Sequence, residues 1–267
     1  MKKKYFMNNA FFTICVFCSC APLILLVLLA IGVSWPFPAL LPRVYSSQYF
    51  HYAFSDNQTL KAIITSILLA IFVTLLTLAI AIPAAKSMAL YSFAGKDLVK
   101  LLILAPLVVP AIAVSTGIQV SMIRLGLTGG FLGVTLIHTV FALPYAIRIM
   151  TSVFEMTGDR HEQQATVLGA DAMITFFRVT LPIIMPGILS AASISFTVSL
   201  SQYITTFLIG GGRIITVNIL LIPYIQSGQV QLAAVYSAML IFAAMLSLFF
   251  MERTVRRFYN FENIVFI

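Results

Sequence analysis

Long stretches without a charged residue are the feature of this sequence that most constrains its fold. Residues 62–85 form a run of 24 uncharged residues and residues 101–123 a run of 23. At a rise of about 1.5 Å per residue, either run can cross the hydrocarbon core of a bilayer, about 30 Å, as an α-helix. Only 9% of the 267 residues are charged, too few to cover a water-soluble surface. We therefore expect the chain to fold in lipid.

Six spans can be separated along the chain. The run at 179–212 exceeds one span, but it opens with two prolines and closes with three glycines, so we place its helix at 187–209. The run at 214–251 is too short for two spans and a turn, so it holds one. The sequence predicts an all-α transmembrane fold with a single domain over residues 1–267. The expected spans are 10–34, 62–85, 101–123, 125–147, 187–209 and 232–250.

Six spans place both termini on one side of the membrane, and the basic residues indicate which side. Of the 16 Lys and Arg residues, 12 fall on the side of the termini and 4 in the opposite loops. Excess Lys and Arg mark the cytoplasmic side, so both termini are expected in the cytoplasm. The net charge of +8 then reflects topology, and nucleic acid is not an expected partner. The 12 residues are Lys2, Lys3, Lys4, Lys86, Lys96, Lys100, Arg148, Arg160, Arg178, Arg253, Arg256 and Arg257.

The sequence lacks the motifs of an enzyme. His161 and Glu162 begin like a zinc-protease helix, but Ala165 occupies the position of the second histidine ligand. A C-x-x-C-x-C run lies within the first apolar stretch, where cysteine behaves as a small apolar residue. We therefore expect no catalytic residue and no bound metal. A secondary transporter and a membrane-embedded enzyme of lipid metabolism are the alternative classes.

The longest polar interruption, residues 154–182, is expected to be a folded cytoplasmic loop. Asp159 and Glu162 have the spacing of a capping box, which predicts a short helix that ends at Gly169. Asp171 can cap a second short helix, which the following Leu-Pro pair would end. A short helix exposed below the membrane is suited to docking in the groove of a partner. An amphipathic loop resting on lipid is the alternative.

The same loop resembles the EAA loop of the membrane subunits of bacterial binding-protein-dependent ABC importers. The family's loop reads E-A-A-x-x-x-G and closes on an apolar-x-L-P ending, and the distance from Gly169 to that ending agrees here. Gln163 and Gln164 replace the family's Glu and first Ala. The resemblance implies a six-helix, MetI-like permease fold whose coupling loop, residues 154–182, binds the ATPase subunit. The implied contact residues are Glu162, Gln163, Gln164, Ala165, Leu168, Gly169, Ala170 and Asp171.

The resemblance also implies the partners of the chain. A six-span chain supplies half of a two-sided pathway, so a second permease chain is expected, as a heterodimer in preference to a homodimer. Two cytoplasmic ATP-binding subunits and an extracytoplasmic solute-binding protein complete such an importer in the bacterial inner membrane, in contact with membrane lipid. ATP is then used by the partner ATPase, and no cofactor is expected on this chain.

The solute and its path are less strongly indicated. Within the family the sequence is most similar to importers of polyamines, iron(III), thiamine and related solutes. Similar polyamine permeases carry acids at positions that are neutral here, so thiamine or iron(III) is favoured over a polyamine. Helical spacing places Ser195, Ser199 and Gln202 on one stripe, which with His138 is a candidate lining of the path. Small polar residues also pack helices, and His138 can instead form a helix–helix hydrogen bond.

Overall fold

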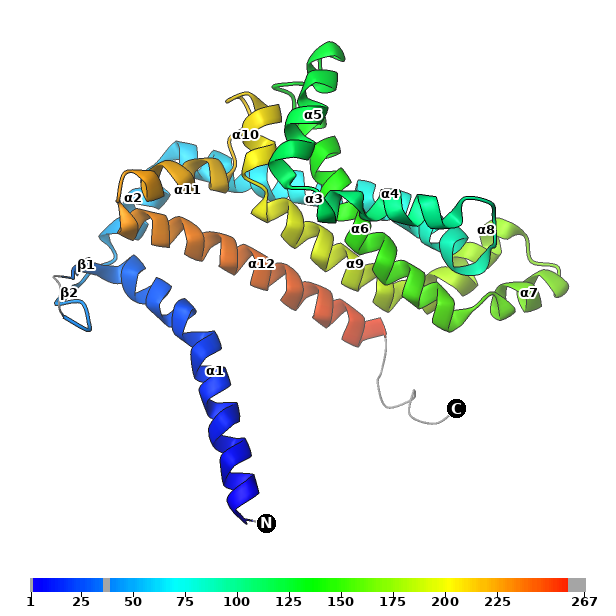
Figure 1. The fold of residues 1–267 in the computed structure, drawn as a ribbon, viewed down its shortest axis with the longest axis horizontal. Helices are drawn as coiled ribbons and strands as arrows, with labels where there is room; N and C mark the ends of the chain where they lie inside the picture. Colours follow the sequence, from blue (N-terminus) through cyan, green and yellow to red (C-terminus); the bar gives the residue numbers. More distant parts are fainter. Residues whose placement is uncertain (1, 36–38, 259–267) are drawn as a thin grey trace. The chain divides into compact units, whose positions relative to one another are not determined.

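The structure is a computed structural model, is mainly helical, and describes residues 2–35 and 39–258 (Figure 1). The side chains of residues 2–11, 13–15, 34, 251 and 255–258 are not described. The predictions for the first cysteine of the C-x-x-C-x-C run, Cys15, and for the basic residues Lys2, Lys3, Lys4, Arg256 and Arg257 therefore lie outside the described residues. The elements are α1 (Lys2–Ile31), β1 (Gly32–Ser34), β2 (Val44–Tyr45), α2 (Gln48–Ser55), α3 (Asn57–Leu90), α4 (Lys96–Val108), α5 (Ala111–Arg124), α6 (Phe131–Thr157), α7 (Arg160–Val167), α8 (Ala172–Thr175), the π-helical turn η1 (Phe176–Thr180), α9 (Leu181–Ser201), α10 (Ile204–Gly210), α11 (Val217–Gln226) and α12 (Val230–Phe258).

The chain divides into two compact units. The first contains residues up to 62 together with 217–242, and the second contains residues 63–216 together with those from 243 onwards. In the first unit, β1 and β2 pair antiparallel. The fully buried Thr59 and Tyr236 share a hydrogen bond of 2.7 Å between their hydroxyl oxygens, which joins the start of α3 to α12.

The second unit is built around α6 and α9, which lie side by side (Figure 1). Met150, Phe154 and Ile184 are buried in their shared core. Gly187 makes the close approach possible, because a Cβ atom at this position would lie 2.6 Å from Cγ2 of Val153. Small residues at such crossings are typical of helix pairs in membranes.

Four helical segments of the described chain are long and apolar enough to cross a membrane: Asn57–Leu90, Phe131–Thr157, Ala172–Ser201 and Val230–Thr254. The first and last contain the expected second and sixth spans, and the other two overlap the fourth and fifth. In the region of the expected first span, the apolar part of α1, Val16–Ile31, is shorter than these four segments.

The expected third span, 101–123, is not one straight helix. Its residues fall in α4 and α5, which are bent by 108° at a break between them. Val109 at the break is extended, and Pro110 follows it. A proline lacks the N–H that would continue the helical ladder and disfavours a helical conformation of the residue before it, which explains the position of the break.

The fifth span also differs from the expectation. The second loop helix was expected to end at Leu181-Pro182, which is wrong: α8, η1 and α9 run on without interruption from Ala172 to Ser201. Pro182 lies in the first turn of α9, directly after the π-helical turn, where the N–H of Leu181 donates to the carbonyl of Phe176. A wider turn is one way in which a helix accommodates a proline. The helix then breaks at Gln202, and α10 covers the rest of the expected 187–209 span.

Candidate functional site: the coupling loop and a buried polar cluster

The helix α7 of the predicted coupling loop ends where the sequence places its end. Gly169 has a positive φ of 85°, a left-handed conformation that glycine adopts without steric cost. The N–H of Ala170 donates to the carbonyl of Ala165 at 3.0 Å, and the N–H of Gly169 donates to Thr166 at 3.0 Å. This pattern satisfies the last carbonyls of the helix, so the predicted stop is confirmed.

One of the two predicted caps is present. The carboxylate of Asp171 accepts a hydrogen bond of 2.7 Å from the N–H of Ile174, so it caps α8 as expected. The capping box of Asp159 and Glu162 is wrong, because the side chain of Asp159 makes no cap and accepts instead from Nε2 of Gln163 at 2.7 Å. The side chain of Glu162 instead bonds to residues outside α7.

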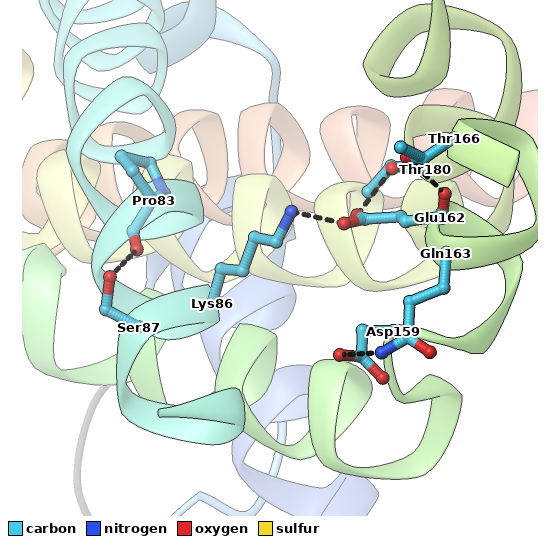
Figure 2. Close-up of polar contacts among 8 residues, drawn as sticks. All are labelled: Pro83, Lys86, Ser87, Asp159, Glu162, Gln163, Thr166 and Thr180. Carbon is cyan, nitrogen blue, oxygen red and sulfur yellow. Dashed lines mark hydrogen bonds and ion pairs between the residues drawn. The ribbon is translucent and has the colours of Figure 1, made fainter. Parts of the chain in front are cut away.

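Glu162 ties three elements together (Figure 2). Its Oε2 accepts from Nζ of Lys86 on α3 at 2.6 Å, and its Oε1 accepts from the hydroxyl of Thr180 in the π-helical turn at 2.6 Å. Lys86 and Glu162 form an ion pair, and both side chains are partly shielded from solvent. Charge-assisted hydrogen bonds of this kind are stronger than neutral ones. Glu162 therefore holds α7 against α3 and the base of the fifth span.

Of the seven other predicted coupling residues, five are exposed and two are half-buried. Gln163 and Gln164 are exposed, Ala165 is half-buried, and Leu168 is 86% exposed beside Val167, which is 87% exposed. Two adjacent apolar side chains that are this exposed at the end of a short polar helix are typical of a site that contacts a partner. The stripe of Gln163, Gln164, Val167 and Leu168 has the i, i+3/i+4 spacing of one helix face.

Two residues of this site, Lys86 and Thr180, cannot be identified from the sequence alone. Lys86 is 76 positions before Glu162, and Thr180 is 18 positions after it. A lysine at the end of an apolar span and an acid in a cytoplasmic loop do suggest a pair. The same side of the chain offers several other basic residues, however, and spacing alone does not choose among them.

Two of the four predicted path residues, His138 and Ser199, meet in a buried polar cluster. His138 is fully buried, with Nδ1 at 3.0 Å from the hydroxyl of Ser199 and Nε2 at 2.9 Å from the hydroxyl of Thr206. These bonds are the helix–helix interaction considered above. The hydroxyl of Ser195 donates to a carbonyl of its own helix, and Oε1 of the half-buried Gln202 accepts from Thr205. A lining role for these residues stays a prediction.

Comparison with known proteins decides the family. Residues 78–259 match the family model described as the binding-protein-dependent transport system inner membrane component. The chain belongs to this family. The spermidine/putrescine permease PotC of Haemophilus influenzae is 24% identical over 78% of this chain and 80% of its own length. The molybdenum permease ModB of the same organism is 32% identical over 54% of this chain and 69% of its own length.

A solved structure shows the same fold. The crystal structure of a bacterial ABC transporter that imports the acidic polysaccharide alginate aligns over 97% of both chains with a TM-score of 0.72 and 14% identity. The chain is thus an all-α, MetI-like ABC importer permease and a multi-pass protein of the inner membrane. Family membership sets aside both the secondary transporter and the lipid-metabolising enzyme.

Proposed function

We propose that this permease forms half of a solute pathway and is driven through its 154–182 loop by a separate ATPase. The observation that carries the proposal is the clamp of Glu162 on Lys86 and Thr180. It fixes a short helix with an exposed, partly apolar stripe to α3 and to the helix Ala172–Ser201. A partner that moves the stripe therefore moves the base of a membrane span.

The proposed mechanism uses this link to carry movement from the ATPase to the membrane span. ATP binding would close a dimer of ATPase subunits and draw together the coupling loops of two permease chains, which favours an outward-facing state. A solute-binding protein would deliver the solute to that state, and hydrolysis would restore the inward-facing one. The second permease chain is proposed as a homologous partner in preference to a copy, and ATP is hydrolysed only by the ATPase subunits.

The solute is proposed to be a small hydrophilic molecule or ion. The relatives named above transport polyamines and molybdenum, and their modest identity assigns neither to this chain. The buried cluster of His138, Ser199 and Thr206 contains no carboxylate. A multiply charged cation near the midplane would need such a partner, which disfavours polyamines and, by the same argument, a bare iron(III) ion. Uptake assays with thiamine, iron(III), molybdate and spermidine in cells that express the complete importer distinguish these solutes.

The substitution Gly169→Asp tests the coupling role. Gly169 is exposed on the loop, and a Cβ atom there would meet nothing within 4 Å, so a side chain is tolerated within the chain apart from backbone strain. We expect loss of transport and of solute-stimulated ATP hydrolysis, because the new carboxylate blocks close approach of the partner. Gly126→Asp is the matched control, since Gly126 also has a positive φ and open space. Survival of both activities in Gly169→Asp would show that the loop is not the docking surface.

A further inference from the structure

A cavity of about 420 Å³ lies between the C-terminal parts of α3 and α6 and the first turns of α4. Its apolar wall includes the buried Met88 and Ile147, and its polar wall includes Lys96, Lys100 and Arg148. Nothing in the coupling mechanism uses this cavity.

The positive charges of the cavity come from two of the helices that line it, α4 and α6. Lys96 and Lys100 are four residues apart on α4, and Arg148 precedes Ser152 and Glu155 on the lining face of α6. Nζ of Lys96 donates to the carbonyl of Tyr91 at 2.9 Å. In the part of the chain that the structure describes, the charges of Lys100, Arg148 and Glu155 take part in no ion pair. Three cations thus face one carboxylate.

We propose that this cavity binds the headgroup of an anionic phospholipid such as phosphatidylglycerol. Arg148 and Lys100 would hold the phosphate, since a guanidinium offers paired donors to phosphate oxygens and an ammonium a compact positive charge. The apolar wall fits the glycerol backbone and the first acyl carbons, which a free phosphate ion lacks. Basic pockets between membrane helices are known to bind such headgroups. Glu155 would accept from headgroup hydroxyls and repel a more highly charged anion.

The proposal goes beyond the transport function and needs neither solute nor ATPase for its test. The purified full chain is placed in phosphatidylcholine vesicles that contain a small share of photoactivatable phosphatidylglycerol, and labelled peptides are mapped and quantified. We expect labelling on α4 and α6, and only weak labelling by photoactivatable phosphatidylcholine. In Lys100→Gln/Arg148→Gln the phosphatidylglycerol labelling should fall about tenfold, because each basic residue contributes on the order of a few-fold or more to anionic-lipid affinity.

Two further variants and a competition with inorganic phosphate complete the experiment. Arg178→Gln/Arg253→Gln removes two exposed arginines outside the cavity and should label like the parent chain. Glu155→Gln should raise the labelling, a gain that misfolding would not produce. Equal labelling by both lipids, or unchanged labelling of the Lys100/Arg148 variant, overturns the proposal. If inorganic phosphate displaces the label as well as unlabelled phosphatidylglycerol does, the site is one for a soluble anion and the lipid assignment is wrong.

Discussion

At the scale of single residues, Glu162 holds the loop together, whereas its neighbours Gln163, Gln164 and Leu168 are exposed. Its two carboxylate oxygens are taken by Lys86 and Thr180, so little of its charge is left for a partner. The neighbouring glutamines, which replace the Glu and Ala of the family's loop, are exposed and carry no charge. The proposed contact with an ATPase should therefore depend on shape and apolar area at Val167 and Leu168 more than on a salt link.

The clamp can be measured with a double-mutant cycle of Lys86→Met and Glu162→Gln. We expect a coupling energy of about 0.5–1 kcal/mol, because the pair is partly open to solvent. The readout is tryptic cleavage after the exposed Arg160, which reports local opening of the loop. Asp159→Asn removes a nearby carboxylate that bonds Gln163 and not Lys86, so its effect on cleavage should be the same with and without Lys86→Met. Strictly additive effects of the two clamp substitutions would contradict the clamp.

The buried imidazole of His138 gives a second prediction. In His138→Leu, the hydroxyls of Ser199 and Thr206 lose their partner on α6, and the free energy of unfolding in detergent should fall by about 1 kcal/mol, as for other hydrogen bonds between membrane helices. Thr135→Val is the control, because the hydroxyl of Thr135 bonds within its own helix. Equal losses in both variants would show that the bonds between helices contribute nothing of their own.

At the scale of elements, the packing of α6 on α9 depends on one missing side chain. Gly187→Ala places a methyl group 2.6 Å from Cγ2 of Val153. We expect it to lower the midpoint of thermal unfolding, at a cost of about 1–3 kcal/mol for the overpacked contact. Gly117→Ala in α5 meets nothing within 4 Å and should be neutral or stabilising, because alanine is the better helix former. An unchanged midpoint for Gly187→Ala would mean that the helix pair can separate freely.

The elements also show which features of the fold can be predicted from the sequence. Length and hydropathy locate the second and sixth spans, because one long apolar run gives one helix. Hydropathy carries no information on direction, so the 108° bend between α4 and α5 escapes it, although Pro110 lies at the break. The prolines at 182 and 186 suggest a helix end, but the π-helical turn before Pro182 lets the helix continue. The conformation of the 154–182 loop can be predicted where it depends on neighbouring residues, as at the helix end at Gly169 and the cap at Asp171. It cannot be predicted where a side chain bonds to a residue far away in the sequence, as Glu162 does to Lys86.

At the scale of the whole molecule, the orientation in the membrane stays a prediction that labelling can test. In a chain whose three cysteines are replaced by alanine, a cysteine is introduced at Ser227 or at Leu168, both exposed. A membrane-impermeant maleimide should label the Ser227→Cys variant in intact cells and the Leu168→Cys variant only after the membrane is opened. The distribution of 12 basic residues against 4 is the physical reason. The reverse pattern would invert the topology and place the coupling loop out of reach of any cytoplasmic ATPase.

The π-helical turn at Phe176–Thr180 has a geometric consequence for how a movement of the loop reaches the membrane. Such a turn holds one residue more than an α-helical turn. Tightening it to α-helical form would rotate every residue beyond it by about 100° around the helix axis and shift it by about 1.5 Å along that axis. The face of α9 that carries Ser195 and Ser199 would then be replaced by another. A helix that remains unbroken from Ala172 to Ser201 can therefore carry a movement of the loop into the membrane as a rotation about its axis as well as a shift along it.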